Sequence, residues 1–298
     1  MKNKDEFGER IKAYESEYEQ RIPYNEYIIV RIDGHKFSRF TKGFKRPFDT
    51  ILSDTFREIT SALVKEFNAV VGYTQSDEIT LVIPPNYGRH LNNICEDTTN
   101  NQIFGGRTQK MSSLISAFTT MKFNEILATQ VKARRDTIKR SLDYIDAERL
   151  LDEMQDTLGY WKLIDTKKVG KAWFDCRVFG VPDETEAFNS VLWRMHDCTK
   201  NSYSQFAYAY CSHKSLLNKT GQEMVEFCKE TTGNDWSETE ERFKYGTIVK
   251  KQDYTKPKTD EEHSQETIRT KTVFISKKLS YSEENVEFLL CKKLEEVK

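Results

Sequence analysis

The sequence lacks a long hydrophobic run and has no excess of charge of either sign. No stretch of about 18 apolar residues occurs among the 298 residues, so we expect no membrane-spanning helix. After Met1, residues 2–6 are polar and charged, unlike the apolar core of a signal peptide, and their acids are atypical of a transit peptide. We therefore expect a cytoplasmic protein without a membrane partner, and the pattern leaves an organellar location open. A net charge of -1 excludes a uniformly basic nucleic-acid binder but not a local basic face.

Cysteine is scarce and scattered. The chain has 6 cysteines, none in a Cys-x-x-Cys pair, and a cytosolic protein would keep them reduced. His196 and Cys198 together with Cys211 and His213 supply four side chains of the types that bind zinc. Their spacing is unusual for zinc, and the segment has a helical pattern. Buried or half-buried thiols are the favoured interpretation, with a metal site as the alternative.

Two acidic stretches organise the chain. Residues 27–34 and 73–82 each place a carboxylate at the boundary of an apolar, β-branched run, where an unpaired buried charge would be costly. Asp33 ends the first predicted strand, and Asp77 begins the second arm of a hairpin. If these strands are neighbours, both acids lie at one edge of a sheet. Paired carboxylates of this kind hold the metal ions of phosphoryl or nucleotidyl transfer.

The alternation of side chains along a strand separates Asp77 from Glu78. The two must point to opposite faces, so only one is expected to bind metal directly. We favour Asp77, because it shares the face of Ile79 and Leu81. The alternative is structural. Asp and Gly favour the turns that end strands, and Asp77 and Glu78 would then be ordinary polar residues of a hairpin.

The order of the predicted elements is strand, helix, hairpin, helix and strand. It indicates an α+β fold with a mostly antiparallel sheet and helices on one face. The expected helices lie before Pro23, after Asp49, from about 108 to 129, over 131–158 and through most of 184–230. The expected strands are 27–33, 69–74, 78–83, 172–181, 245–250 and 271–277, with surface segments at 86–103 and 256–270.

Basic residues follow the first acid directly. The loop at 35–48 carries several Lys and Arg side chains, which suit a triphosphate when they lie beside a metal carboxylate. Gly105 and Gly106 precede Arg107 and a helix, an arrangement that resembles a phosphate cradle. Each of these segments has a plainer alternative as a solvated loop.

Five motifs occur in order along the chain: Arg31-Ile-Asp-Gly-His-Lys-Phe-Ser-Arg-Phe-Thr, Gln75-Ser-Asp-Glu, Arg107-Thr-Gln-Lys, Phe174-Asp-Cys-Arg-Val and Trp193-Arg-Met-His-Asp-Cys. Together they resemble the tRNA-histidine guanylyltransferase superfamily, whose members add nucleotides in the 3′-to-5′ direction. The resemblance spans roughly residues 5 to 250. It implies a polymerase-palm-like domain over 1–183, followed by a fingers-like, mainly helical extension with a small C-terminal β element over 184–298.

The resemblance also implies the chemistry. Two Mg²⁺ ions would be held by Asp33, the carbonyl of Gly34 and Asp77, with Glu78 in a supporting catalytic role. ATP, GTP or another NTP would be bound by Asp33, Gly34, His35, Lys36, Phe37, Ser38, Arg46, Ser76, Asp77, Arg107 and Lys110. The implied partner is a tRNA that crosses the subunits of a homotetramer.

One stretch departs from the family pattern. Thr199, Lys200, Asn201 and Ser202 stand where enzymes specific for tRNA-His carry His-Ile-Asn-Asn, and Ser38 replaces a family His. These features resemble the guanylyltransferase-like branch, which implies template-directed repair of 5′-truncated tRNAs after activation of the 5′-monophosphate by ATP. The alternatives are addition of a single G to tRNA-His, a palm-type nucleotide cyclase, and an RNA-binding protein without catalysis.

Overall fold

The computed structural model describes residues 3–85, 102–142, 148–255, 268–291 and 294–295. Most of the two expected surface segments, at 86–103 and 256–270, lies outside these residues. Within the described part, no helix is long and apolar enough to cross a membrane.

A seven-stranded sheet forms the centre of the molecule. Its order is β4-β1-β3-β2-β5-β6, and β7 also pairs with β5. The pairs along this order are antiparallel, and the β5–β7 pair is parallel. The strands are β1 Tyr27–Gly34, β2 Val71–Gln75, β3 Glu78–Ile83, β4 Phe174–Val181, β5 Thr247–Thr255, β6 Ile268–Ile275 and β7 Leu294–Glu295.

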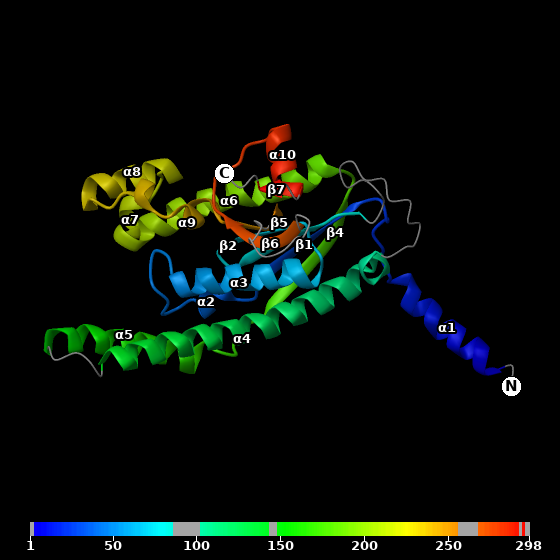
Figure 1. Ribbon diagram of the computed structural model, residues 1–298, viewed down its shortest axis with the longest axis horizontal. Coiled ribbons are helices and arrows are strands. Elements are labelled where there is room, and N and C mark those ends of the chain that lie inside the picture. Colours follow the sequence, from blue (N-terminus) through cyan, green and yellow to red (C-terminus); the bar gives the residue numbers. More distant parts are fainter. Residues whose placement is uncertain (1–2, 86–101, 143–147, 256–267, 292–293, 296–298) are drawn as a thin grey trace, which may run out of the picture.

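The helices are α1 Asn3–Glu17, α2 Phe37–Phe40, α3 Thr50–Glu66, α4 Thr108–Leu142, α5 Glu148–Lys167, α6 Glu184–Tyr210, α7 His213–Leu216, α8 Gly221–Thr232, α9 Glu241–Tyr245 and α10 Glu283–Leu290. The long helix α4 continues past its predicted end near Thr129, because buried Leu127 and Val131 extend its apolar side by another turn. Helix α5 packs beside the second half of α4, and the two form an arm that extends from the sheet (Figure 1).

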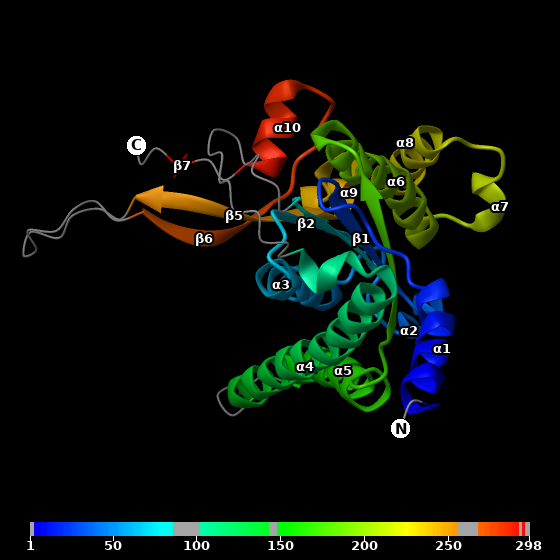
Figure 2. The same ribbon diagram turned by 90° about the vertical axis from the view of Figure 1, so that its right-hand side faces the viewer.

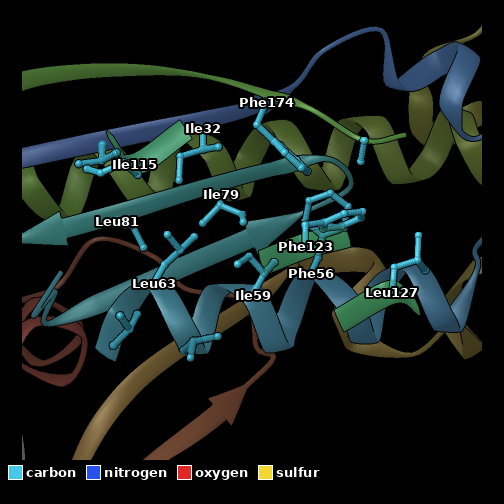
Figure 3. Packing of buried hydrophobic residues seen from close by; sticks show 14 of the residues in the cluster. Ile32, Phe56, Ile59, Leu63, Ile79, Leu81, Ile115, Phe123, Leu127 and Phe174 are labelled. Atoms are coloured by element: carbon cyan, nitrogen blue, oxygen red, sulfur yellow. The ribbon is translucent and has the colours of Figure 1, made fainter. Parts of the chain in front are cut away.

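Alternation along β1 divides the core between the two faces of the sheet. Ile28, Val30 and Ile32 pack with α3 and α4 on one face, which Figure 3 shows from close by. Tyr27 and Ile29 pack on the other face with residues of α6 and α10. The α+β prediction with an antiparallel sheet is confirmed. The predicted layer of helices on one face consists of α3 and α4. The second face is covered as well, by α6 and α10 from the C-terminal part of the chain (Figure 2).

The predicted N-terminal helix is present, but its apolar side has no cover in the described part of the chain. Phe7, Tyr14 and Tyr18 are 60%, 61% and 70% exposed. Helix α1 points away from the sheet and the other labelled helices in Figure 1.

Candidate active site

The sheet register brings the two acidic stretches together. Asp33 near the end of β1 pairs with Glu78 at the start of β3, and on its other side it pairs with Asp175 of β4. The backbone N–H of Gly34 donates to the carbonyl of Asp77, at 3.1 Å. The two strands are therefore neighbours, and Asp33, Gly34 and Asp77 meet at one edge of the sheet.

The carboxylate of Asp77 lies in an environment that opposes its charge. Burial raises the pKa of Asp77, and the nearby Asp33 and Glu78 carboxylates raise it further, whereas a hydrogen bond from Ser76 Oγ to Asp77 Oδ1 (3.0 Å) lowers it. Such a site favours a positive ligand, which would remove the repulsion between the acids.

Two residues beside the acids have left-handed backbone conformations. Ser76 has φ 49° and Lys36 has φ 54°, although neither is glycine. This conformation is uncommon for residues with a side chain and costs free energy, so the surrounding structure must enforce it. Both the turn before Asp77 and the loop after Asp33 therefore carry backbone strain, as do Asn68, Phe104 and Asn218 elsewhere in the described residues.

Glu78 is engaged by a residue that the sequence did not single out as part of the site. Arg194 of α6 donates from Nε and Nη2 to the two carboxylate oxygens of Glu78, at 2.5 and 2.6 Å, and Nη2 also donates to Asp197 at 3.0 Å. Burial raises the pKa of Glu78, and the Arg194 guanidinium opposes that rise. Both oxygens of Glu78 face a guanidinium, which suits a supporting role and not metal binding. The sequence signal for Arg194 was its place in the motif at 193–198.

The loop after Asp33 is fixed by one buried ring. Phe37 is 3% exposed and packs among other phenylalanines, including Phe56 and Phe174, whereas Lys36 and Ser38 point to solvent. The backbone N–H of His35 donates to the carbonyl of Trp173, at 2.9 Å. Phe37 therefore belongs to the core, and its neighbours in sequence are the exposed groups.

We predict that Gly34→Ala destabilises this loop. An added Cβ would lie 2.2 Å from Cδ2 of Phe37, and this buried ring already packs against Phe56 and Phe174. Overpacking of this kind lowers the free energy of unfolding by about 1–3 kcal/mol, which urea denaturation would measure. Gly159→Ala in α5 is the matched control, since nothing lies within 4 Å of its added Cβ. The control should be neutral or slightly stabilising, and equal effects of the two changes would contradict the steric argument.

A cavity of about 410 Å³ adjoins the hairpin turn that carries Asp77. Its lining includes Arg46, Ser76, Asn201 and Ser202. The basic loop, the hairpin and the stretch of α6 that departs from the family pattern (residues 199–202, the departing stretch) therefore border the same cavity. Asp49 holds the basic loop in place by accepting hydrogen bonds from the backbone N–H of Lys45 and of Leu52, at 2.8 and 3.1 Å, and from the hydroxyl of Tyr160.

The other two members of the departing stretch do not line this cavity. Thr199 bonds its own helix through the carbonyl of Met195, and Lys200 is exposed to solvent.

Two predicted phosphate contacts lie far from the acids. Arg107 and Lys110 stand at the start of α4, whereas Thr120, further along α4, accepts from the backbone N–H of Phe174 beside the sheet partner of Asp33. Thirteen residues of helix separate Arg107 from Thr120, which is about 20 Å. One copy of the chain therefore does not bring Arg107 and Lys110 to the acidic pair.

The four candidate zinc ligands do not form a site. No group of three His, Cys, Asp or Glu side chains suited to a metal occurs in the described residues. His196 is exposed, and His213 stacks on Tyr208 with ring centroids 5.5 Å apart. Cys198 is buried, which raises the pKa of its thiol to about 12, and Cys211 lies 3.9 Å from Thr231 Oγ1.

Known proteins resemble the chain over most of its length. Protein R259 of Acanthamoeba polyphaga mimivirus, itself uncharacterised, is 30% identical over 97% of this chain and 90% of its own. A bacterial tRNA(His) guanylyltransferase (Thg1)-like protein in complex with ATP has a TM-score of 0.62 and 28% identity, covering 83% of this chain and 87% of that one. In complex with GTP, such a bacterial protein has a TM-score of 0.58 and 26% identity, covering 90% of both chains. The family model Thg1, tRNAHis guanylyltransferase, matches residues 8–182, so the chain belongs to the tRNAHis guanylyltransferase family.

Proposed function

We propose that this protein is a 3′-to-5′ nucleotidyltransferase that rebuilds the 5′ end of truncated tRNAs by pairing to the acceptor strand. Family membership supports the coarser part, nucleotidyl transfer to tRNA with ATP and GTP as the bound nucleotides. The observation that carries the proposal is the meeting of Asp33, Gly34 and Asp77 beside a cavity lined by Arg46 and Ser76.

The donor set at the sheet edge fits Mg²⁺. Two carboxylates and a backbone carbonyl are hard oxygen donors, and Mg²⁺ is commonly bound by one or two carboxylates, with substrate phosphates and water completing the octahedron. Asp33, the Gly34 carbonyl and Asp77 would hold the ions, and the raised pKa of Asp77 indicates where positive charge is needed. When bound, such ions activate the attacking oxygen and neutralise charge on the leaving group.

Two transfers make up the proposed reaction. In the first, an oxygen of the RNA 5′-monophosphate attacks the α-phosphorus of ATP, pyrophosphate leaves, and the 5′ end becomes adenylated. In the second, the 3′-OH of an incoming NTP attacks the activated 5′ phosphate and AMP leaves. Arg46, which lines the cavity, would bind phosphate there, and Ser76 would orient Asp77 through its hydrogen bond.

The choice of tRNA repair over single-G addition rests on the departing stretch of α6. Asn201 and Ser202 line the same cavity as Arg46, so a change of residue types there alters the surroundings of the bound nucleotide. Addition of a single G to tRNA-His is the second candidate, favoured by the family model that matches residues 8–182.

A homotetramer is part of the proposal. The exposed apolar side of α1 supports a contact with another copy of the chain, since Phe7 and Tyr14 are 60% and 61% exposed. The separation of Arg107 and Lys110 from the acids gives a second reason. If these side chains bind phosphate at a catalytic site, another copy of the chain has to supply them.

An extension assay tests the proposal. With ATP, GTP and Mg²⁺, we expect kcat/KM for a 5′-truncated tRNA to exceed that for full-length tRNA-His by about tenfold or more, which corresponds to about 1.4 kcal/mol. Preference for tRNA-His would establish the second candidate. Cyclic nucleotide formed from ATP without RNA would indicate a cyclase, and tRNA binding without turnover would indicate a non-catalytic binder.

A further inference from the structure

Trp193 is an exposed aromatic ring fixed beside the acids. It lies on α6, and 58% of it is exposed. The guanidinium carbon of Arg194 lies 4.5 Å from the ring centroid, and that of Arg31 lies 5.7 Å from it. Arg194 is at the same time bonded to Glu78, the sheet partner of Asp33. The ring is therefore held to the candidate active site while much of its surface faces solvent.

Two arginines face each other on the sheet next to this ring. Arg31 of β1 pairs directly with Arg177 of β4, so both side chains lie on the same face of the sheet. Like charges in this arrangement are destabilising. Neither arginine forms an ion pair within the described part of the chain. Phe179, two residues further along β4, is 43% exposed. We call Trp193, Arg31, Arg177 and Phe179 the Trp193 surface.

The chemistry of this surface matches a nucleic-acid end. Exposed aromatic rings stack on unpaired bases, and guanidinium groups bind phosphate and stack on bases as well. An anion would also relieve the repulsion between Arg31 and Arg177. Arg31 precedes Asp33 by two strand residues, about 7 Å, which is close to the length of one nucleotide step.

We propose that Trp193 stacks on the nucleobase at the 5′ end of the RNA substrate, and that Arg31 and Arg177 bind the phosphates next to that base. This inference rests on the proposed function and assigns the RNA to the face of the sheet that carries Asp33. A nucleobase could also come from a free NTP, so the test separates these two sources.

A binding experiment without nucleoside triphosphate tests this assignment. A 5′-truncated tRNA carrying 2-aminopurine as its terminal base reports stacking by loss of fluorescence. We expect quenching with the parent protein and with Trp193→Phe, and none with Trp193→Ala. The affinity for this RNA should fall about 5- to 150-fold in Trp193→Ala, and less in Trp193→Phe. Tyr210→Ala, on the same helix and 42% exposed, is the matched control and should bind as the parent does.

A second variant, Arg177→Gln, tests the proposed phosphate contact through the salt dependence of RNA binding. Arg177→Gln should reduce the slope of log affinity against log salt concentration by about one, since one phosphate contact is lost. Thermal melting of each variant would show that it is folded.

Three results would overturn the inference. The first is an unquenched terminal base with the parent protein. The second is a loss of affinity for ATP or GTP alone in Trp193→Ala, with RNA binding intact, because the base would then belong to the nucleotide. The third is a changed oligomeric state in Trp193→Ala with RNA binding intact, because a second copy would then cover the ring. Failure of the extension assay with the parent protein would instead contradict the proposed function, and the quenching readout does not depend on turnover.

Discussion

Replacing Asp77 by asparagine is expected to abolish nucleotide addition and to leave the fold intact. The amide keeps the shape of the side chain but removes the charge that would hold a divalent cation beside Asp33. Loss of charge stabilisation worth about 4 kcal/mol at the reacting phosphates corresponds to about a thousandfold in rate. Single-turnover extension of a truncated tRNA would measure the loss, and Asp33→Asn should behave in the same way.

The neighbouring Asp175 provides a matched control for this result. It pairs with Asp33 across the sheet, as Glu78 does on the other side, but its side chain is exposed. Asp175→Asn should change the rate by less than about tenfold. Equal losses at Asp77 and Asp175 would mean that general negative charge at this edge matters, and not a ligand at Asp77.

Stability separates a lost ligand from a damaged fold. Burial and the Asp33 carboxylate raise the folded pKa of Asp77 above its ordinary value of 3.8. The ionised side chain therefore opposes folding, and stability falls as the pH rises from 3.8 through the folded pKa. Asp77→Asn removes this penalty, so without metal the variant should unfold at the parent's urea concentration or above it at pH 7. The stabilisation that Mg²⁺ and ATP give the parent should be smaller in the variant.

Local pattern was enough to predict the sheet around the acids. The β-branched run that ends at Asp33 and the short polar turn before Asp77 identify a strand and a hairpin, because period-two alternation and turn residues act over a few positions. Their pairing with each other followed from the assumption that these strands are neighbours. The structure has that pairing, with Asp33 opposite Glu78.

Contacts between segments that are far apart in the chain could not be predicted from the sequence pattern. The bond from Arg194 to Glu78 joins residues that are 116 positions apart, and no spacing rule connects an arginine on a helix to one carboxylate on a particular strand. For Arg107, the sequence predicted a contact that one copy of the chain does not make. A motif placed it with the phosphate contacts, whereas the length of α4 places it far from Asp33. Periodicity gives the face of a helix, but the position along the sheet depends on the packing of the whole domain.

Arg194→Met is expected to produce the largest loss of stability. The side chains of Arg194 and Glu78 are only 11% and 10% exposed, so the substitution leaves a buried carboxylate without its counter-charge. Breaking such a pair from one side costs about 3–5 kcal/mol, whereas removing both charges costs much less. The double variant Arg194→Met with Glu78→Gln should therefore recover most of the lost free energy of unfolding in urea.

Lys122→Met provides the comparison, because it breaks an exposed ion pair. The side chains of Lys122 and its partner Glu125 are 34% and 59% exposed. This substitution should change the free energy of unfolding by less than about 1 kcal/mol. If Arg194→Met is equally mild, Glu78 is not held by charge, and helix α6 must be positioned at the sheet edge of Asp33 and Asp77 by its apolar contacts alone. If the double variant recovers stability but not nucleotide addition, the bond between Arg194 and Glu78 serves the geometry of the neighbouring Asp77 as well as the fold.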